Sequence, residues 1–235
     1  SYSVTGVQTC ALPILHNIIK NHTVISYNEV WSALEDLDED PSNSSNVLLI
    51  YTRRSEPKTH KDQGSFTLDW ENSWNREHLW PKSHGFPKEE QPPYTDIHHL
   101  RAADRSVNTN RSTKEFKNGG TPHNEAIECN FTSTTWEVPD SIKGDISRAL
   151  FYMAVRYEGD IFNEPDLELV DTNTPDTNNP PIFGYLSTLI EWNNFDPPDQ
   201  NERTRNTKIY EKYQFNRNPF IDHPEWVELI WGNGN

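Results

Sequence analysis

The chain has 235 residues, enough to bury one sizeable hydrophobic core within a single domain. No apolar run approaches the ~20 residues that a membrane-spanning helix needs, so we expect no association with a membrane. The formal net charge of −15 argues against a protein that coats a polyanion, because affinity for nucleic acid rests largely on Lys and Arg.

The charge is unevenly distributed along the chain. Between Arg76 and Lys117, eight basic residues stand against six acidic ones, a balance of +2, whereas the remainder carries thirteen basic and thirty acidic residues, a balance of −17. A locally basic face on an acidic body can guide an anionic substrate into one cleft. A merely solvated acidic surface explains the remainder but not this contrast.

The first fourteen residues form a segment that we expect to be non-native. Val4–Ile14 reads like the translation of a common sequencing-adapter oligonucleotide, so we exclude it from fold reasoning. The expected organisation is therefore one domain over residues 15–235. Under this hypothesis any secretion signal was lost with the true start. Cys129 would then be the only authentic cysteine, which cannot form an internal disulfide.

Hydrophobic periodicity predicts the elements of the N-terminal third. Residues 15–37 carry apolar side chains at helical spacing, and an acidic loop follows over residues 36–46. The aliphatic and β-branched run over 47–52 predicts a buried strand, and residues 66–70 form a second short strand that leads into the next motif.

The C-terminal half is predicted to be mainly helical. Gly144–Glu158 is the clearest helix, and because it is apolar on nearly every face we expect it to be central and buried. Three further helices are predicted over residues 184–192, 202–214 and 224–231.

An acidic loop over residues 159–181 separates these helices. Four of its side chains offer oxygen atoms that could bind Ca²⁺, although such loops are usually just solvated. They are Asp171, Asn173, Asp176 and Asn178.

Two short segments carry most of the chemical information. Trp74–Pro81 places Glu77 directly beside His78, and Tyr94–Arg101 follows after a loop as a second strand. Asp104–Lys117 then offers a helix rich in Asn and Arg. A metal ligand, a proton acceptor and cations on one strand–loop–strand–helix unit are the parts that phosphodiester hydrolysis needs.

This unit resembles the ββα-metal (His-Me finger) core of the bacterial endonuclease I family of secreted or periplasmic, non-specific nucleases. Three further stretches resemble the family, namely Gly144–Met153, Glu202–Asn206 and Asn216–Ile221, so the resemblance runs from about Val47 to Trp231. It implies an α+β fold in which the ββα-metal core packs against several helices. It also implies a secreted or periplasmic location, and we expect a monomer.

The resemblance further implies a metal-dependent endonuclease that hydrolyses phosphodiester bonds of DNA, RNA or both. Little sequence preference and 5′-phosphate products are expected. Lack of specificity makes physical sense, because contacts to the nucleic-acid backbone carry no base information.

His78 is the candidate general base, because a neutral imidazole near pH 7 can deprotonate an attacking water. A packing histidine is the alternative. Glu77 is the candidate metal ligand: if the strand ends here, neighbouring side chains diverge, so His78 faces the water while Glu77 faces the ion.

By position, the family's ligand pattern pairs Glu77 with Asn108, for which a surface or capping amide is the alternative. Carboxylate and amide oxygens suit Mg²⁺, with Mn²⁺ or Ca²⁺ as alternatives at the same site, whereas an Asn oxygen is a poor zinc ligand.

Three arginines are candidate phosphate ligands, because a planar guanidinium can grip two phosphate oxygens. They are Arg76, Arg101 and Arg111. On a helix, Arg111 shares a face with Asn108 and Asp104, so it could reach a phosphate at the metal or pair with Asp104 or Glu115.

One departure from the family concerns the loop between the two strands. Some relatives place a phosphate-stabilising arginine in a longer insertion there. In this chain the loop from Leu79 to Pro93 is short and carries only Lys82 and Lys88 as cations, so the cation for that role is not assigned.

Two other functional classes fit parts of the sequence. A zinc hydrolase could use His78, His84, His98 and His99, although adjacent histidines on a strand point to opposite faces. A non-catalytic glycan- or surface-binding domain could use exposed aromatic residues, with Trp74 and Trp80 as the candidates for stacking.

Residues 216–219 match the family in a loop that we expect to brace the cleft through backbone hydrogen bonds.

Overall fold

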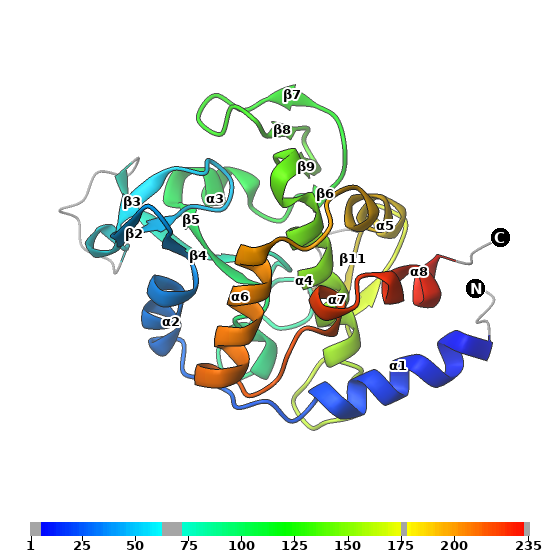
Figure 1. Cartoon of the computed structure of the whole chain (residues 1–235). Helices are drawn as coiled ribbons and strands as arrows, with labels where there is room; N and C mark the ends of the chain where they lie inside the picture. Colours follow the sequence, from blue (N-terminus) through cyan, green and yellow to red (C-terminus); the bar gives the residue numbers. More distant parts are fainter. Residues whose placement is uncertain (1–5, 63–71, 175–177, 233–235) are drawn as a thin grey trace.

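The computed structural model describes residues 6–62, 72–174 and 178–232, and its architecture is the expected α+β class (Figure 1). The α helices are α1 (Gly6–Ile19), α2 (Glu29–Leu37), α3 (Arg105–Arg111), α4 (Lys143–Arg156), α5 (Leu186–Phe195), α6 (Gln200–Lys208), α7 (Pro219–Asp222) and α8 (Glu225–Trp231). Short helical turns are η1 (Lys58–His60), η3 (Pro92–Thr95), η4 (Asp140–Ile142) and the π-helical η5 (Ile209–Tyr213).

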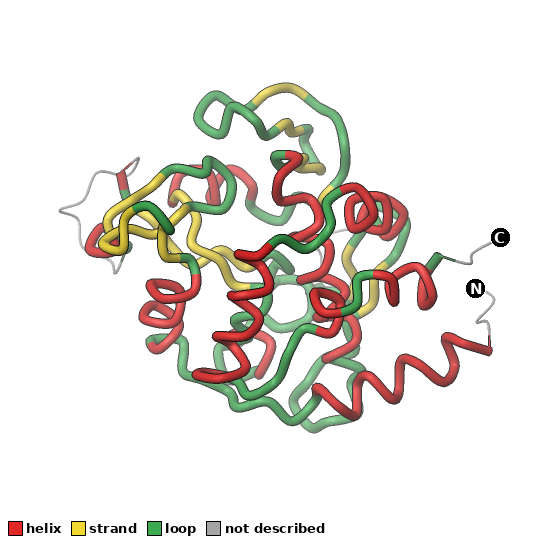
Figure 2. The backbone as a smooth tube through the Cα atoms, in the orientation of Figure 1, coloured by secondary structure: helices red, strands yellow, loops and turns green. Residues whose placement is uncertain are grey.

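The strands are short and form small separate sheets rather than one large one (Figure 2). They are β1 (Glu39–Asp40), β2 (Asn43–Leu48), β3 (Ser55–Pro57), β4 (Trp74–His78), β5 (Leu100–Asp104), β6 (Glu115–Phe116), β7 (Thr121–Pro122), β8 (Asn130–Phe131), β9 (Thr135–Glu137), β10 (Glu168–Leu169) and β11 (Ile182–Phe183). The sheet orders are β1-β2-β3, β4-β5, β6-β9-β8-β7 and β10-β11.

Helix α4 lies at the centre of the molecule, as its all-round apolar pattern predicts (Figure 1). Nearly all its side chains are buried, and it packs against α1, α5 and α7. Gly144 permits the close approach of its first turn to the end of α5, because a Cβ there would collide with the main-chain oxygen of Asp196. The central helix therefore anchors the elements around it.

The antiparallel pair β4–β5 lies between two hydrophobic clusters. One face contributes Trp74, Leu100 and Ala102 to a cluster with α2, in which the Trp74 and Trp31 rings meet edge to face with centroids 5.1 Å apart. The other face contributes Ala103 to the main cluster built around α4. A strand pair packed on both faces is held in one position, which suits a site that needs fixed side chains.

The N-terminal elements differ from the sequence prediction in their boundaries. The helical region 15–37 is two helices, α1 and α2, and residues 20–28 connect them. A reciprocal cap starts α2: the Ser26 N–H donates to Glu29 Oε2 at 2.7 Å, and the Glu29 N–H donates to Ser26 Oγ at 3.3 Å.

Helix α1 runs without a break across residue 14, which is the last residue of the segment predicted to be non-native. Leu15 and Ile19 are buried. The expectation of a non-native start stays a prediction.

Three predicted elements are shifted or shortened. The strand predicted over 47–52 ends at Leu48, because the chain turns there and Arg53 adopts a left-handed conformation (φ 57°). Residues 96–99 are a turn before β5, and the helix predicted over 104–117 ends at Arg111, where Ser112 takes φ 52°. The strand predicted over 66–70 lies outside the described residues.

The four helices predicted in the C-terminal half are confirmed, with shifted ends. In chain order they are α4, α5, α6 together with η5, and α8. Among the described helices, none is long and apolar enough to cross a membrane.

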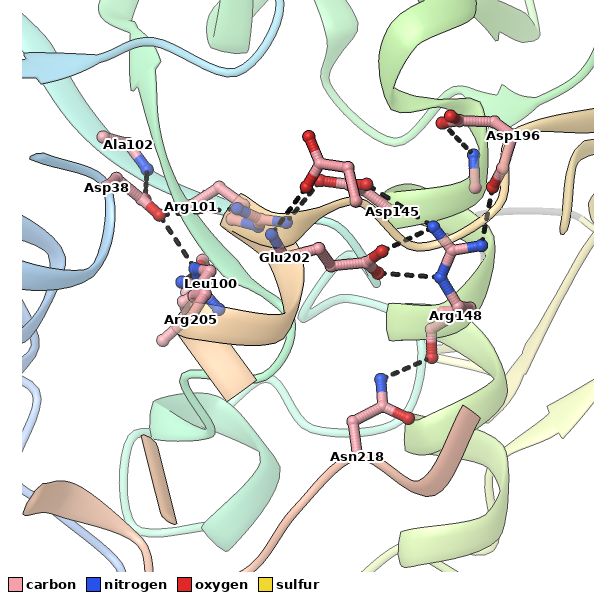
Figure 3. A network of polar contacts seen from close by, with 12 residues as sticks. Asp38, Leu100, Arg101, Ala102, Asp145, Arg148, Asp196, Glu202, Arg205 and Asn218 are labelled. Atoms are coloured by element: carbon pink, nitrogen blue, oxygen red, sulfur yellow. Dashed lines mark hydrogen bonds and ion pairs between the residues drawn. The ribbon is translucent and has the colours of Figure 1, made fainter. Parts of the chain in front are cut away.

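A buried polar network ties β5 to the helical body (Figure 3). Asp38, just after α2, accepts from the Ala102 N–H at 2.8 Å and from Arg205 Nε at 2.9 Å. Arg205 of α6 also donates to the main-chain oxygens of Ile97 and Leu100 at 2.9 and 2.8 Å. One carboxylate and one guanidinium thus join α2, β5 and α6.

A second buried carboxylate, Asp96, joins the turn before β5 to α4. Its Oδ2 accepts from the hydroxyls of Tyr152 at 2.9 Å and Tyr157 at 2.8 Å, and its Oδ1 accepts from Gln214 Nε2 at 3.0 Å. His22 Nε2 lies 3.9 Å from Oδ2.

We expect Asp38→Ala to lower the free energy of unfolding by about 3–5 kcal/mol, because it leaves the buried Arg205 without its counter-ion. Asp36→Ala is the matched control: Asp36 pairs with Lys208 and Lys212 at the surface, where such pairs contribute about 0–1 kcal/mol. Urea unfolding of both variants measures this. Equal losses in the two would contradict the assigned role of Asp38.

Stability should also fall as the pH drops from about 6.5 to 4. Burial lowers the pKa of His22 and of His98 to about 4, with Asp96 acting in the opposite direction on both. The unfolded chain therefore binds these protons near pH 6.5, before the folded chain does. Each histidine then contributes a slope of about 1.4 kcal/mol per pH unit within that window.

The His22→Gln variant should show a shallower pH dependence than the wild type in urea unfolding between pH 7 and 4. Parallel curves for the two proteins would remove His22 from this account.

Candidate active site

Strand β4, strand β5 and helix α3 form the unit that carries the predicted site. β4 pairs antiparallel with β5 so that Glu77 lies opposite Arg101 and His78 opposite Leu100. β5 runs directly into α3 at Asp104, whose carboxylate accepts from Thr52 Oγ1 at 2.6 Å and Arg54 Nε at 3.0 Å. These bonds fix the corner at which strand becomes helix.

Two hydrogen bonds between side chains attach α3 to β4. Asn108 Nδ2 donates to Asn75 Oδ1 at 2.7 Å, and Arg111 Nη1 donates to Glu77 Oε1 at 3.0 Å. Residues 75 and 77 share a strand face, and residues 108 and 111 are one helical turn apart. The contacts therefore bring Glu77 and Asn108 to the same side of the unit.

Both candidate metal ligands keep one oxygen open. Glu77 is 1% exposed, and its Oε1 accepts from Tyr51 Oη at 2.6 Å as well as from Arg111. Its Oε2 has no hydrogen-bond partner in the described part of the chain. Because Asn75 takes the amide nitrogen of Asn108, the amide oxygen is the atom left for a ligand. A carboxylate oxygen and an amide oxygen that are left without partners on the same side of the unit fit a hard divalent cation.

Burial sets the electrostatics of Glu77. It raises the pKa of the carboxyl, while the Arg111 guanidinium and the Tyr51 hydroxyl act in the opposite direction. Burial together with the neighbouring carboxylate also raises the pKa of Tyr51, which keeps its hydroxyl protonated as a donor.

His78 is oriented by a main-chain acceptor. Its Nε2 lies 2.9 Å from the Tyr94 oxygen, and because a carbonyl only accepts, Nε2 carries the proton. Nδ1 is then the basic nitrogen, and it has no partner among the described residues. Burial, with a smaller contribution from His99, lowers the pKa of His78 well below its usual value, so the imidazole is neutral.

The ring of His78 sits among aromatic side chains that limit its rotation. Its centroid lies 5.0 Å from that of Tyr94, 5.5 Å from His99, 6.0 Å from Tyr27 and 6.4 Å from Phe86. His78 is 8% exposed, so the residue is buried but not fully enclosed.

Arg111 does not occupy the position expected of a phosphate ligand. It is 1% exposed, and besides Glu77 it donates to the main-chain oxygens of His78 at 2.9 Å and Leu79 at 2.7 Å. The alternative partners, Asp104 and Glu115, form no ion pair with it. The helix ends at Arg111, and its guanidinium lies at the end of β4, where it contacts Glu77.

Arg76 and Arg101 are also engaged by the protein. The Arg76 guanidinium stacks 3.3 Å from the Tyr27 ring centroid and 4.2 Å from that of Trp31, and it donates to the Tyr27 oxygen. Arg101 pairs with Asp38 at 3.4 Å and with Asp145 at 3.2 Å (Figure 3).

A cavity of about 280 Å³ opens beside Arg101, between α2, α4 and α6. Its lining carries more carboxylates than cations, and neither Glu77, His78 nor Asn108 belongs to it. The cavity borders Arg101, which lies opposite Glu77 on the strand pair, but the candidate ligands and base do not line it.

The alternative zinc cluster does not assemble. His98 Nε2 lies 3.2 Å from Asn216 Oδ1, His99 Nε2 lies 2.8 Å from the Pro93 oxygen, and His84 Nδ1 lies 2.9 Å from the Ile182 oxygen. Across residues 6–62, 72–174 and 178–232, no group of three or more His, Cys, Asp or Glu side chains could hold a metal ion. The described residues of the acidic loop over 159–181 therefore form no such group either. Asp176 of that loop lies outside the described residues.

The two candidate stacking residues, Trp74 and Trp80, are fully buried and belong to the core. The loop over residues 216–219 braces the helical body through both side chains and backbone. Asn216 Nδ2 donates to Tyr152 Oη at 2.8 Å, and the Asn218 N–H donates to Asn206 Oδ1 at 2.8 Å.

Three residues that orient the site were missed in the sequence. Asn75 holds Asn108, and its alternation with Glu77 on β4 was a usable signal. Tyr51 holds Glu77 from 26 residues away, and Tyr94 holds His78 through a main-chain atom. Neither of the last two leaves a pattern in the sequence.

Comparison with known proteins identifies the family of this chain. The family model described as Endonuclease I matches residues 11–225. The chain is 52% identical over 217 residues to an extracellular ribonuclease of Bacillus subtilis (strain 168) and 50% identical over 217 residues to one of Bacillus amyloliquefaciens. Each alignment covers 92% of this chain and 72% of the relative. This chain belongs to the Endonuclease I family and is a nuclease, an enzyme whose substrate is nucleic acid.

Proposed function

We propose that this nuclease is a metal-dependent endonuclease that uses His78 as its general base and binds one Mg²⁺-like ion through Glu77 and Asn108. One observation carries the proposal. The hydrogen bonds that orient these three side chains leave open His78 Nδ1, Glu77 Oε2 and Asn108 Oδ1, which are the atoms that the chemistry needs.

His78 accepts the proton of the attacking water. The Tyr94 oxygen holds the Nε2 proton in place, so the imidazole presents its Nδ1 lone pair without rearrangement. A base that is neutral at physiological pH and fixed in one orientation can accept a proton from water without rearranging.

Glu77 and Asn108 supply the oxygens that would hold the ion, for which Mn²⁺ or Ca²⁺ are alternatives to Mg²⁺. When bound, a divalent cation neutralises charge that develops on the phosphate and on the leaving 3′ oxygen. Departure of the 3′ oxygen leaves the phosphate on the 5′ end of the product.

RNA is the substrate that the comparisons favour, because both relatives are named extracellular ribonucleases. Their names also support secretion of this enzyme. DNA is retained as a second substrate of the same chemistry, with little sequence preference for either, and a monomer suffices because one chain supplies all three groups. A non-catalytic binding domain is no longer tenable for a member of a nuclease family.

We expect His78→Ala to lower kcat for RNA cleavage by ~10²–10⁴-fold, the usual contribution of a general base. The control is His223→Ala, which removes a histidine that is about half exposed and pairs with Glu225. Single-turnover cleavage of a labelled RNA in Mg²⁺ measures both. A His78→Ala enzyme with more than about a tenth of wild-type activity would falsify the assignment.

Glu77→Ala and Asn108→Ala should each weaken Mg²⁺ binding by about tenfold or more, a loss of ~1.4 kcal/mol. Isothermal titration calorimetry measures this without reference to activity, and Asn110→Ala, an exposed neighbour on α3, is the control. Stoichiometric Zn²⁺ should not replace Mg²⁺ in cleavage assays. Unchanged Mg²⁺ affinity in both variants would place the ion elsewhere.

A further inference from the structure

Hydrolysis of a phosphodiester is assisted by positive charge placed at the scissile phosphate. In the transition state, negative charge grows on the phosphate oxygens, and fixed donors or cations aimed at it lower the barrier. Arg76 stacks on aromatic rings, Arg101 is paired with Asp38 and Asp145, and Arg111 is buried. None of these three guanidiniums is free for the phosphate, which leaves the other cations near His78.

Lys82 is a cation near His78 whose charge the protein leaves uncompensated. It lies four residues beyond His78 in the loop that follows β4, and its side chain is exposed. Its Nζ donates to Tyr94 Oη at 2.8 Å and lies 5.0 Å from the centroid of the Tyr94 ring. Within the described residues it forms no ion pair. A neutral phenol orients the ammonium but does not cancel its charge.

Tyr94 joins Lys82 to the general base. Its main-chain oxygen accepts from His78, its hydroxyl accepts from Lys82, and its ring meets the imidazole edge to face. The ammonium and the imidazole centroid each lie 5.0 Å from the Tyr94 ring centroid, so they are no more than twice that distance apart. A phosphodiester attacked by water from His78 is therefore within reach of the long, flexible lysine.

We propose that Lys82 is a catalytic residue whose ammonium neutralises the scissile phosphodiester while His78 deprotonates the water. The inference rests on the proposed function. The water oxygen forms a bond to phosphorus and gives its proton to His78 Nδ1. The bond from phosphorus to the 3′ oxygen breaks, and that oxygen takes a proton from solvent. Lys82 keeps its protons throughout and supplies charge alone.

The loop contains its own control. Lys88 is the other lysine between the two strands, and its backbone N–H bonds Gln91 Oε1 at 3.0 Å. In the described part of the chain it makes no hydrogen bond or cation–π contact with Tyr94 or His78. Lys82→Met and Lys88→Met remove the same charge from the same loop and differ in this contact.

The test is single-turnover cleavage of a single-stranded RNA in saturating Mg²⁺. We expect Lys82→Met to lower kcat by ~10²–10³-fold, the typical effect of losing one transition-state donor. Lys82→Arg should keep kcat within about tenfold of wild type because it retains the charge. Lys88→Met should leave kcat unchanged. Mg²⁺ affinity by calorimetry and the urea midpoint should match wild type in all three.

A Lys82→Met enzyme that keeps more than about a tenth of wild-type kcat would overturn the inference. Equal losses of kcat in Lys82→Met and Lys88→Met would also overturn it, as would a Lys82→Arg enzyme with as little activity as Lys82→Met. The same holds if the loss of kcat in Lys82→Met is accompanied by weaker Mg²⁺ binding or lower stability. Tyr94→Phe is a second probe, because it removes the hydroxyl that orients Lys82 and leaves the carbonyl that orients His78. If kcat of Tyr94→Phe falls by less than twofold, that result would also count against the inference.

The reference variant is His78→Ala. If it is inactive while Lys82→Met is active, only the role of Lys82 fails. If His78→Ala cleaves as fast as wild type, the proposed function itself fails.

Discussion

The guanidinium of Arg111 is the interaction on which the site depends. It holds the Glu77 carboxylate and the main-chain oxygens of His78 and Leu79 at distances of 2.7–3.0 Å. Because this group is planar and permanently charged, it fixes the direction of three acceptors at once. It thereby locks α3, which carries Asn108, against the end of β4, which carries Glu77 and His78. Losing one partner of such a buried pair typically costs about 3–5 kcal/mol, since the other charge is left uncompensated.

The same principle explains how an acidic chain can cut a polyanion. Most buried cations are used internally: Arg205 with Asp38, Arg148 with Glu202 at 2.6 Å, and Arg156 with Glu164 at 2.7 Å. These pairs join the helical body to the strand pair and contribute little to the field outside. In our proposal, substrate binding depends on charges near the site that have no ion-pair partner among the described residues, and Lys82 is one of them. Net charge is therefore a poor guide to function here, because internally paired cations enter the count without adding to the field outside.

The sequence predicted the parts of the site that lie next to each other along the chain. Glu77 and His78 are on one strand that ends at His78, and Asn108 lies on the helix that follows the second strand, as the motif implied. Helix α4 was predictable because its apolar side chains surround it. Local pattern and tertiary structure agree in these segments.

The remainder depends on contacts between residues distant in sequence. Arg111 lies 34 residues from Glu77, and spacing alone could not decide between a phosphate, Asp104, Glu115 and Glu77 as its partner. Residues 47–52 show a second limit. Their aliphatic run predicts a strand, but Leu49 and Ile50 are buried beyond the end of β2, because a short apolar run signals burial and not conformation.

The central claim is that Glu77 and Asn108 share one divalent ion beside His78. A crystal structure of the enzyme with Mn²⁺ as a stand-in for Mg²⁺ tests it most directly, because anomalous scattering locates the metal independently of activity. We expect one anomalous peak within about 2.5 Å of both Glu77 Oε2 and Asn108 Oδ1, on the side that His78 Nδ1 faces. A peak bound by His84, His98 or His99, or no peak at Glu77 in saturating Mn²⁺, would contradict the account.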